Sequence, residues 1–209
     1  MTQRFISVTG FVLAGGASRR MGRDKATLIL GDETLLSRQV RVLRTVCRKV
    51  VVVGPARNFP ELAAPVVADV LPGRGPLGGI YTGLLHTRTE YNLVVGCDLP
   101  FLEPRFLRFL CERALESRAD FTVAQSRDRK MQPLCAVWRR RILGQLRRCL
   151  EAGKYKASGL YRRAPCRVIP WPEVQRAGFA PRLFVNLNTP TDYEGARRSV
   201  GVAVERLRS

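Results

Sequence analysis

Short apolar runs alternate with stretches of helical spacing along most of this chain, and this alternation limits the folds that it can adopt. Residues 50–53 are four consecutive valines followed by Gly54-Pro55, and residues 93–95 form a second such run. Strands that are apolar on both faces are typical of a parallel sheet with helices on each side. Because no run approaches the roughly 20 residues that cross a bilayer, we expect no membrane-spanning segment and a cytoplasmic protein.

The pattern predicts an α/β fold, with one three-layer αβα domain over residues 1–209 and a mostly parallel, Rossmann-like sheet. A first helix is expected to begin after the N-cap Thr34 and to carry Leu36, Val40, Leu43 and Cys47 on one face. We expect further helices at residues 77–86, 103–117, 139–152 and from about 193, and strands at residues 5–13, 50–53, 66–68, 93–95, 121–124, 135–138, 167–169 and 184–186. Loops at the carboxyl ends of parallel strands converge on one crevice, and the second half of the chain is expected to form its acceptor side.

The net charge of +19 comes almost entirely from arginine, with 31 arginines and 5 lysines. This charge favours anionic partners, namely nucleotides, phosphorylated cofactors, nucleic acid or acidic proteins, although a solvated arginine-rich surface would give the same composition. The six cysteines are scattered with no C-x-x-C pair, and there is one histidine. We therefore expect reduced thiols and no Cys/His zinc site.

The loop after the first expected strand combines glycine with positive charge. Residues 13–25 read Leu-Ala-Gly-Gly-Ala-Ser-Arg-Arg-Met-Gly-Arg-Asp-Lys, so Gly15 and Gly16 are followed by cations that include Arg20 and Lys25. Glycines let backbone N–H groups approach an anion closely, which predicts a phosphate cradle. The spacing is not that of a Walker A loop. The alternative is a plain glycine turn with a solvated basic flank.

Asp98 follows a buried strand directly, between Gly96 and Pro100. A carboxylate at this position, beside a phosphate loop, is a natural ligand for Mg²⁺, which takes one or two carboxylates together with substrate phosphate oxygens. The alternative role for Asp98 is to cap the following helix.

Two further loops carry candidate contacts. Gly73, Gly75 and Gly78 match G-x-G-x-x-G, but several residues separate them from their strand, so we interpret the match as accidental. The glycine-proline loop after Asp69 is better placed to hold a nucleobase or ribose, with Gly78 among the expected binding residues and Asp69 accepting hydrogen bonds. In residues 184–190, an expected strand ends in the polar amides Asn186 and Asn188, which either face the crevice or form an Asx turn.

Four segments together closely resemble the molybdenum cofactor guanylyltransferases: residues 13–25, residues 75–80 (G-P-L-G-G-I), residues 96–100 (G-C-D-L-P) and residues 186–190 (N-L-N-T-P). The resemblance implies a nucleotide-binding α/β domain of the nucleotide-diphospho-sugar transferase type. It also implies that GTP and molybdopterin are joined, with Mg²⁺, into a guanine dinucleotide cofactor and pyrophosphate.

The resemblance also implies roles for individual residues. Leu13, Ala14 and Gly15 would line the GTP site, Arg20 and Lys25 would meet its phosphates, Asp69 would contact the nucleotide, Asp98 would bind Mg²⁺, and Asn186 and Asn188 would face the pterin phosphate. An asparagine that follows the second strand in some members is replaced here by Gly54-Pro55, so that contact is left unassigned.

Other functions remain open at this stage. The first is a nucleotidyltransferase of the same fold that uses CTP or a sugar phosphate; Gly15-Gly16 favours guanine by resemblance alone. The second is an arginine-rich nucleic-acid-binding module, which the charge favours but the aromatic residues do not, because aromatic and basic residues do not interleave. The positive charge would also favour acidic proteins that hand over or receive the cofactor.

Overall fold

A seven-stranded sheet forms the centre of the computed structural model, which describes residues 5–15, 24–55, 62, 64–161 and 163–208. The strand order is β5-β4-β1-β6-β8-β7-β9. The strands are β1 (Phe5–Leu13), β4 (Cys47–Gly54), β5 (Val66–Ala68), β6 (Tyr91–Gly96), β7 (Phe121–Gln125), β8 (Met131–Arg139) and β9 (Cys166–Ile169). All neighbours are parallel except β8, which is antiparallel to both β6 and β7. The mostly parallel sheet expected from the apolar runs is therefore confirmed.

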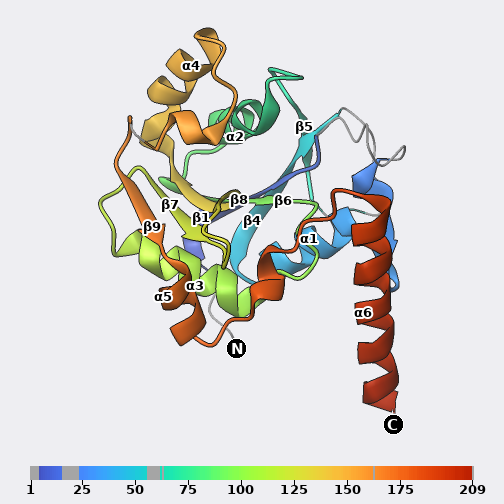
Figure 1. Cartoon of the computed structure of the whole chain (residues 1–209). Coiled ribbons are helices and arrows are strands. Elements are labelled where there is room, and N and C mark those ends of the chain that lie inside the picture. The colour runs from blue at the N-terminus through green and yellow to red at the C-terminus, as the bar shows by residue number, and fades with distance from the viewer. Residues whose placement is uncertain (1–4, 16–23, 56–61, 63, 162, 209) are drawn as a thin grey trace.

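Helices cover both faces of this sheet and make three layers (Figure 1). The helices α2 (Gly75–Leu85) and α4 (Leu143–Glu151) pack on one face, and α1 (Leu35–Arg44), α3 (Pro104–Leu115) and α5 (Trp171–Arg176) pack on the other. Each face has its own apolar core, in which Phe11, Ile80 and Trp138 are fully buried on the first side and Val52 and Phe106 on the second. The alternation of side chains along β1 supplies both cores.

The carboxyl ends of the three central parallel strands lie level with one another. Leu13 at the end of β1 is in register with Val53 of β4 and Gly96 of β6. The next residues continue this pairing, because the amide of Ala14 donates to the carbonyl of Val53 at 2.8 Å and the amide of Cys97 donates to that of Leu13 at 3.3 Å. The loops that follow these strands therefore leave the sheet at the same edge, as expected for a binding crevice.

Most expected elements form, with shifted ends. Thr34 caps α1 as expected, since its hydroxyl accepts a hydrogen bond from the amide of Ser37. Cys47, however, is not on that helix but begins β4, because α1 ends at Arg44 and the chain turns through Thr45. Cys47 is still fully buried, which is why it fits the helical spacing of apolar residues. The expected helix at residues 139–152 begins as the 3-10 turn Arg140–Ile142 and continues as α4.

The strand expected at residues 184–186 does not form. Phe184 ends the 3-10 turn Pro181–Phe184, whose Pro181 suits the first position of such a turn. Val185 donates its amide back to the carbonyl of Arg182 at 3.1 Å, so the backbone is used locally rather than in the sheet. Two other elements, α5 and the two-stranded sheet of β2 (Ile29–Leu30) and β3 (Glu33–Thr34), are not predicted by the sequence pattern.

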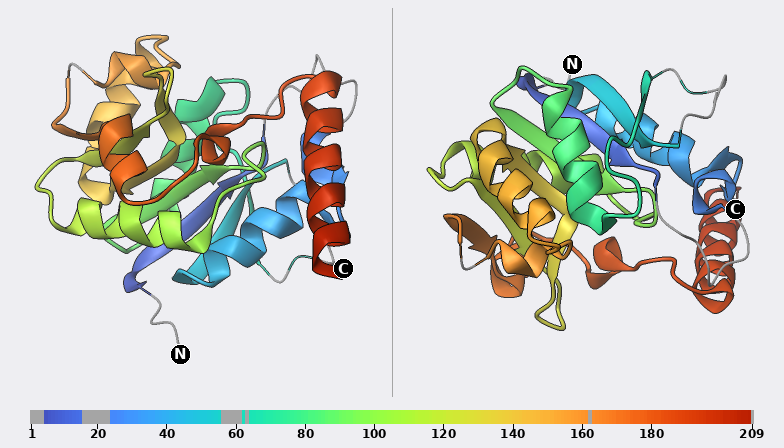
Figure 2. Two further views of the ribbon diagram at one scale, coloured as in Figure 1. Left: turned by 60° about the horizontal axis from the view of Figure 1, so that its bottom comes forward. Right: turned by 90° about the horizontal axis from the view of Figure 1, so that it is seen from above.

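The last helix, α6 (Pro190–Arg208), stands at one flank of the molecule beside α1, away from the centre of the sheet (Figure 2). A small third core ties it to the body, where Leu30, Leu187 and Ala196 are buried together. Across the part of the chain that the structure describes, no helix combines the length and apolarity needed to span a membrane.

Candidate functional site

A pocket of about 220 Å³ lies at the carboxyl ends of β1, β4 and β6. Its walls come from the strand ends and from the beginnings of the loops and helix that follow them. The lining residues are Leu13, Ala14, Gly15, Asp24, Lys25, Val53, Asp69, Gly75, Pro76, Gly79, Gly96, Cys97, Asp98 and Leu134. The mouth therefore combines carboxylates and an ammonium group with an apolar wall, which is the usual composition of a small-molecule site.

Lys25 and Asp98 meet at this pocket from opposite sides. Lys25 begins the 3-10 turn Lys25–Thr27, which Asp24 caps by accepting a hydrogen bond from the amide of Ala26 at 3.0 Å. The ammonium nitrogen of Lys25 lies 3.7 Å from Oδ2 of Asp98, and the two side chains are 17% and 21% exposed. The same nitrogen donates a 2.9 Å hydrogen bond to Oδ1 of Asn188. Three segments far apart in the sequence therefore converge on one cation.

The carboxylate of Asp98 is in an unfavourable place for a negative charge. Burial raises the pKa of Asp98 above its ordinary value, and the positive charge of Lys25 opposes this rise. Burial, together with the charge of the neighbouring Asp98, likewise raises the pKa of the Cys97 thiol to about 12. A cation near Asp98 therefore stabilises its ionised form, and among the described residues Lys25 supplies such a charge.

Gly96 leaves the space that the Asp98 side chain occupies. A Cβ atom placed on Gly96 would lie 2.6 Å from Oδ1 of Asp98, a distance that real Cβ atoms do not show. The glycine thus allows the carboxylate to fold back over the end of β6, into the pocket. In the sequence Gly-Cys-Asp, the glycine is therefore required to make room for the Asp98 carboxylate, and not only to form a turn.

Asp69 lines the same pocket from the end of β5 and is held by its own loop. Its amide donates to the carbonyl of Gly54 at 3.2 Å, which continues the pairing of β5 with β4. Its Oδ1 accepts hydrogen bonds from the amide of Leu71 at 3.0 Å and from the hydroxyl of Thr82 at 2.7 Å. When it is ionised, the Asp69 side chain can only accept hydrogen bonds.

The structure brings six of the expected site residues together. Leu13, Ala14, Gly15, Lys25, Asp69 and Asp98 all line the pocket. Asn188 joins them through Lys25, whereas Asn186 is not in the lining and donates its side-chain amide to the carbonyl of Phe184 at 3.0 Å. Gly16 and Arg20, which we also expected at the phosphates, lie outside the described residues.

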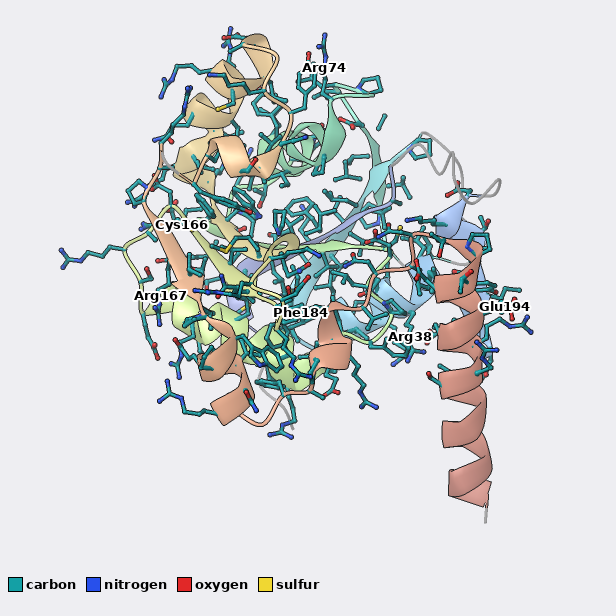
Figure 3. All side chains as sticks on the ribbon, viewed as in Figure 1. Arg38, Arg74, Cys166, Arg167, Phe184 and Glu194 are labelled. Carbon is teal, nitrogen blue, oxygen red and sulfur yellow. The ribbon has the colours of Figure 1, made fainter. Side chains whose placement is uncertain are left out.

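Gly78, which we also expected to contact the nucleotide, is buried in the first turns of α2 and is not in the pocket lining. A Cβ there would lie 3.0 Å from the carbonyl oxygen of Leu71 and 3.1 Å from Cβ of Arg74, so the glycine lets the preceding loop pack on the helix. Arg74 lies on the α2–α4 side of the molecule (Figure 3), with its guanidinium 4.8 Å from the ring centre of Tyr155. The loop that holds Asp69 is therefore packed on its outer side as well.

Gly79 and Leu134 line the pocket but are not among the expected site residues. Gly79 lies against the pocket wall, since a Cβ there would be 3.1 Å from Cδ1 of Leu13. Leu134 comes from the first half of β8 and precedes residues 135–138, where the strand was expected. In the structure Pro133 is tolerated because β6, which pairs with β8 as far as Cys135, has already ended at that level.

The donor set suits a divalent cation that is shared with a substrate. In the described part of the chain, no group of three or more His, Cys, Asp or Glu side chains is arranged to hold a metal ion. Asp98 is a half-buried carboxylate in a space that a Cβ on Gly96 would fill, with Asp24 in the same pocket. Magnesium commonly binds through one or two carboxylates plus phosphate oxygens and waters, so these residues fit such an ion.

Comparisons with known proteins point to one family. The MobA-like NTP transferase domain matches residues 10–168. A probable molybdenum cofactor guanylyltransferase of Chloroflexus aggregans is 36% identical over 199 residues, which are 93% of this chain and 95% of the relative.

Solved structures share the fold. Molybdopterin-guanine dinucleotide biosynthesis protein A of Archaeoglobus fulgidus has a TM-score of 0.79 at 22% identity, covering 92% of this chain and 98% of that one. A Mycobacterium tuberculosis protein crystallised in complex with manganese has a TM-score of 0.64 at 19% identity, covering 92% and 98% of the two chains.

Proposed function

We propose that this chain, which belongs to the family of MobA-like NTP transferases, is a molybdenum cofactor guanylyltransferase. It would transfer GMP from GTP to the terminal phosphate of molybdopterin, giving the guanine dinucleotide cofactor and pyrophosphate. The observation that carries the proposal is the meeting of Lys25 and Asp98 in a pocket at the carboxyl ends of the central parallel strands. A cation and a half-buried carboxylate at this edge of the sheet suit a triphosphate with its metal ion.

In this proposal the first half of the chain holds the nucleotide. The backbone at Leu13, Ala14 and Gly15 would line the GTP site, and Asp69 would accept a hydrogen bond from the base or the ribose. Lys25, with Arg20, would meet the phosphates. The charge of the Lys25 ammonium favours a phosphate oxygen, and its contact with Asn188 would orient it.

The reaction requires no protein nucleophile. An oxygen of the acceptor's terminal phosphate attacks the α-phosphorus of GTP, the new P–O bond forms, and the bond to the α,β-bridging oxygen breaks with release of pyrophosphate. Positioning and charge neutralisation carry most of the catalysis in phosphoryl chemistry of this kind. Lys25 is suited to stabilise the negative charge that develops on the departing pyrophosphate, because its ammonium lies inside the pocket.

Asp98 would hold the Mg²⁺ ion. When bound, such an ion neutralises charge on the phosphate oxygens and fixes their orientation. Asp98 is suited to this role because its carboxylate is buried enough to favour a nearby cation, as the raised pKa indicates. Asp24 lines the same pocket and is a further carboxylate within the site, beside Asp98 and Asp69.

The second half of the chain would bind the acceptor. Asn188 reaches the pocket through Lys25, and the amide of Leu187 donates to the carbonyl of Asp98 at 2.9 Å, so the two halves meet at this point. We infer that Asn186 and Asn188 lie toward the pterin phosphate. The charge of +19 would attract both anionic substrates, and also acidic proteins that hand over or receive the cofactor.

The deciding experiment is mass spectrometry after incubation with GTP, Mg²⁺ and molybdopterin. The guanine dinucleotide cofactor and pyrophosphate are expected only when all three are present. Calorimetric titration with GTP, CTP and UTP tests the nucleotide separately, and preference for CTP would end the guanine assignment. Tight, salt-sensitive RNA binding without nucleotide turnover would contradict an enzymatic role.

A further inference from the structure

Thr82 is a buried polar side chain to which the proposed reaction gives no role. It lies on α2 with 0% exposure, in a layer that is otherwise apolar, beside Ile80 and Leu84. Burying a hydroxyl group costs free energy unless its hydrogen bonds are made, so the partners of a fully buried threonine indicate what the hydroxyl does.

The hydroxyl of Thr82 both donates and accepts a hydrogen bond, and both partners belong to the loop that begins at Asp69. It donates to Oδ1 of Asp69 at 2.7 Å and accepts from the amide of Val70 at 3.2 Å. Oδ1 also accepts from the amide of Leu71, so two donors fix the same carboxylate oxygen. Among the described residues no hydrogen bond falls on Oδ2, although the side chain lines the pocket.

The position of Thr82 relative to the sheet is set by the close packing of α2 on β1. A Cβ on Gly83 would lie 3.1 Å from the ring of Phe11, and one on Gly79 would lie 3.1 Å from Cδ1 of Leu13. These glycines therefore let α2 approach β1 closely. The hydroxyl is carried on a helix that is seated directly on the strand whose end lines the pocket.

We propose that Thr82 is a positioning residue, which holds Asp69 with one carboxylate oxygen occupied and the other directed to an N–H or O–H donor of the nucleotide. The inference rests on the proposed function, because it takes Asp69 as a nucleotide contact. A carboxylate that is already oriented loses less rotamer freedom when the ligand binds, so the ligand binds more tightly. Hydrogen bonds to an ionised acceptor are among the stronger ones, which suits this purpose.

The test is a double-mutant cycle on nucleotide affinity, with calorimetry on the full chain and the nucleotide that wild type prefers. Thr82→Val removes the hydroxyl at nearly constant shape and is expected to weaken binding and raise KM by about tenfold, with a much smaller change in kcat. Thr82→Ser keeps the hydroxyl and should restore affinity. In an Asp69→Ala background, Thr82→Val should cause no further loss, because the group that it orients is gone.

A second buried threonine serves as the matched control. The hydroxyl of Thr9 accepts hydrogen bonds from Thr87 and Thr89, away from the pocket. Thr9→Val should lower thermal stability and leave nucleotide affinity unchanged.

Two results would overturn the inference and leave the proposed function standing: wild-type affinity in Thr82→Val while Asp69→Ala is impaired, or an equal loss with and without Asp69. Preference for CTP would overturn the guanine assignment alone, because the double-mutant cycle of Thr82 and Asp69 would then be measured with CTP and would still test the inference.

Discussion

The ammonium group of Lys25 lies between Asp98 and Asn188, 3.7 Å from Oδ2 of the first and 2.9 Å from Oδ1 of the second. Asp98 follows the central strand β6, whereas Asn188 precedes α6 in the last part of the chain. One cation thus joins the two sides of the pocket. Its charge keeps the pKa of Asp98 lower than burial alone would set it.

Removal of this cation should impair the reaction more than the fold. We expect Lys25→Ala to lower kcat/KM for GTP by about tenfold or more, because a charge-assisted phosphate contact is lost. Lys49→Ala is the matched control, since Lys49 is exposed near the start of β4 and outside the pocket. Steady-state kinetics with far-ultraviolet circular dichroism measures both effects. Equal rates in wild type and Lys25→Ala would refute the assigned role.

The sequence predicts the pocket well where chemistry follows a strand end directly. Leu13, Asp69 and Asp98 each end or follow a parallel strand, and register alone brings such positions to one edge of the sheet. Thr82 could not be found in this way. Its role depends on how closely α2 approaches β1, which is a tertiary distance with no local signature.

Two expectations about secondary structure were wrong, at Cys47 and at residues 184–186, because local spacing does not separate the possible elements. Cys47 is fully buried in β4, but a buried cysteine would fit the end of the helix equally well, so its apolar character could not separate the two. Asn186 and Asn188 follow apolar residues that suggest a strand, yet the amide of Leu187 is paired with the carbonyl of Asp98 outside the sheet. Spacing along the chain carries no information about such long-range backbone contacts.

Asp98 should weaken the fold while it serves the reaction. Burial raises the pKa of this carboxyl, so the folded state binds its proton more readily than the unfolded state does. The stability that the protonated group contributes is present at low pH and is lost as the pH rises through the raised pKa. Asp98→Asn, which stays neutral, should therefore melt at a higher temperature than wild type at pH 7, and the difference should shrink in acid.

The same variant should lose activity, because an amide is a poor ligand for Mg²⁺ beside phosphates. We expect turnover to fall by about tenfold or more and to respond less to added Mg²⁺. Thermal unfolding at pH 7 and at pH 3 checks the predicted stability of Asp98→Asn, and turnover measured over a series of Mg²⁺ concentrations checks its predicted loss of activity. A lower melting temperature for Asp98→Asn at pH 7 would contradict burial as the dominant influence.

The N-cap of α1 offers a test that concerns the fold alone. Thr34→Ala removes the acceptor of the Ser37 amide, which should cost about 1 kcal/mol of unfolding free energy. For a chain of this size such a loss lowers Tm by roughly 2–4 °C. Thr34→Ser keeps the oxygen and should unfold close to wild type. An unchanged midpoint in denaturant for Thr34→Ala would mean that water replaces the cap without cost.

Gly96→Ala tests whether the space beside Asp98 is needed for activity. A Cβ at 2.6 Å from Oδ1 must displace the carboxylate, so we expect turnover to fall by about tenfold or more with the chain still folded. Gly195→Ala is the matched control, because Gly195 lies on α6 with nothing within 4 Å of an added Cβ. There alanine should raise stability slightly, since it favours a helix over glycine by roughly 1 kcal/mol. Full activity in Gly96→Ala would show that Asp98 can reach the nucleotide and its metal ion from another rotamer, and the carboxylate position described here would then not be the one that the reaction uses.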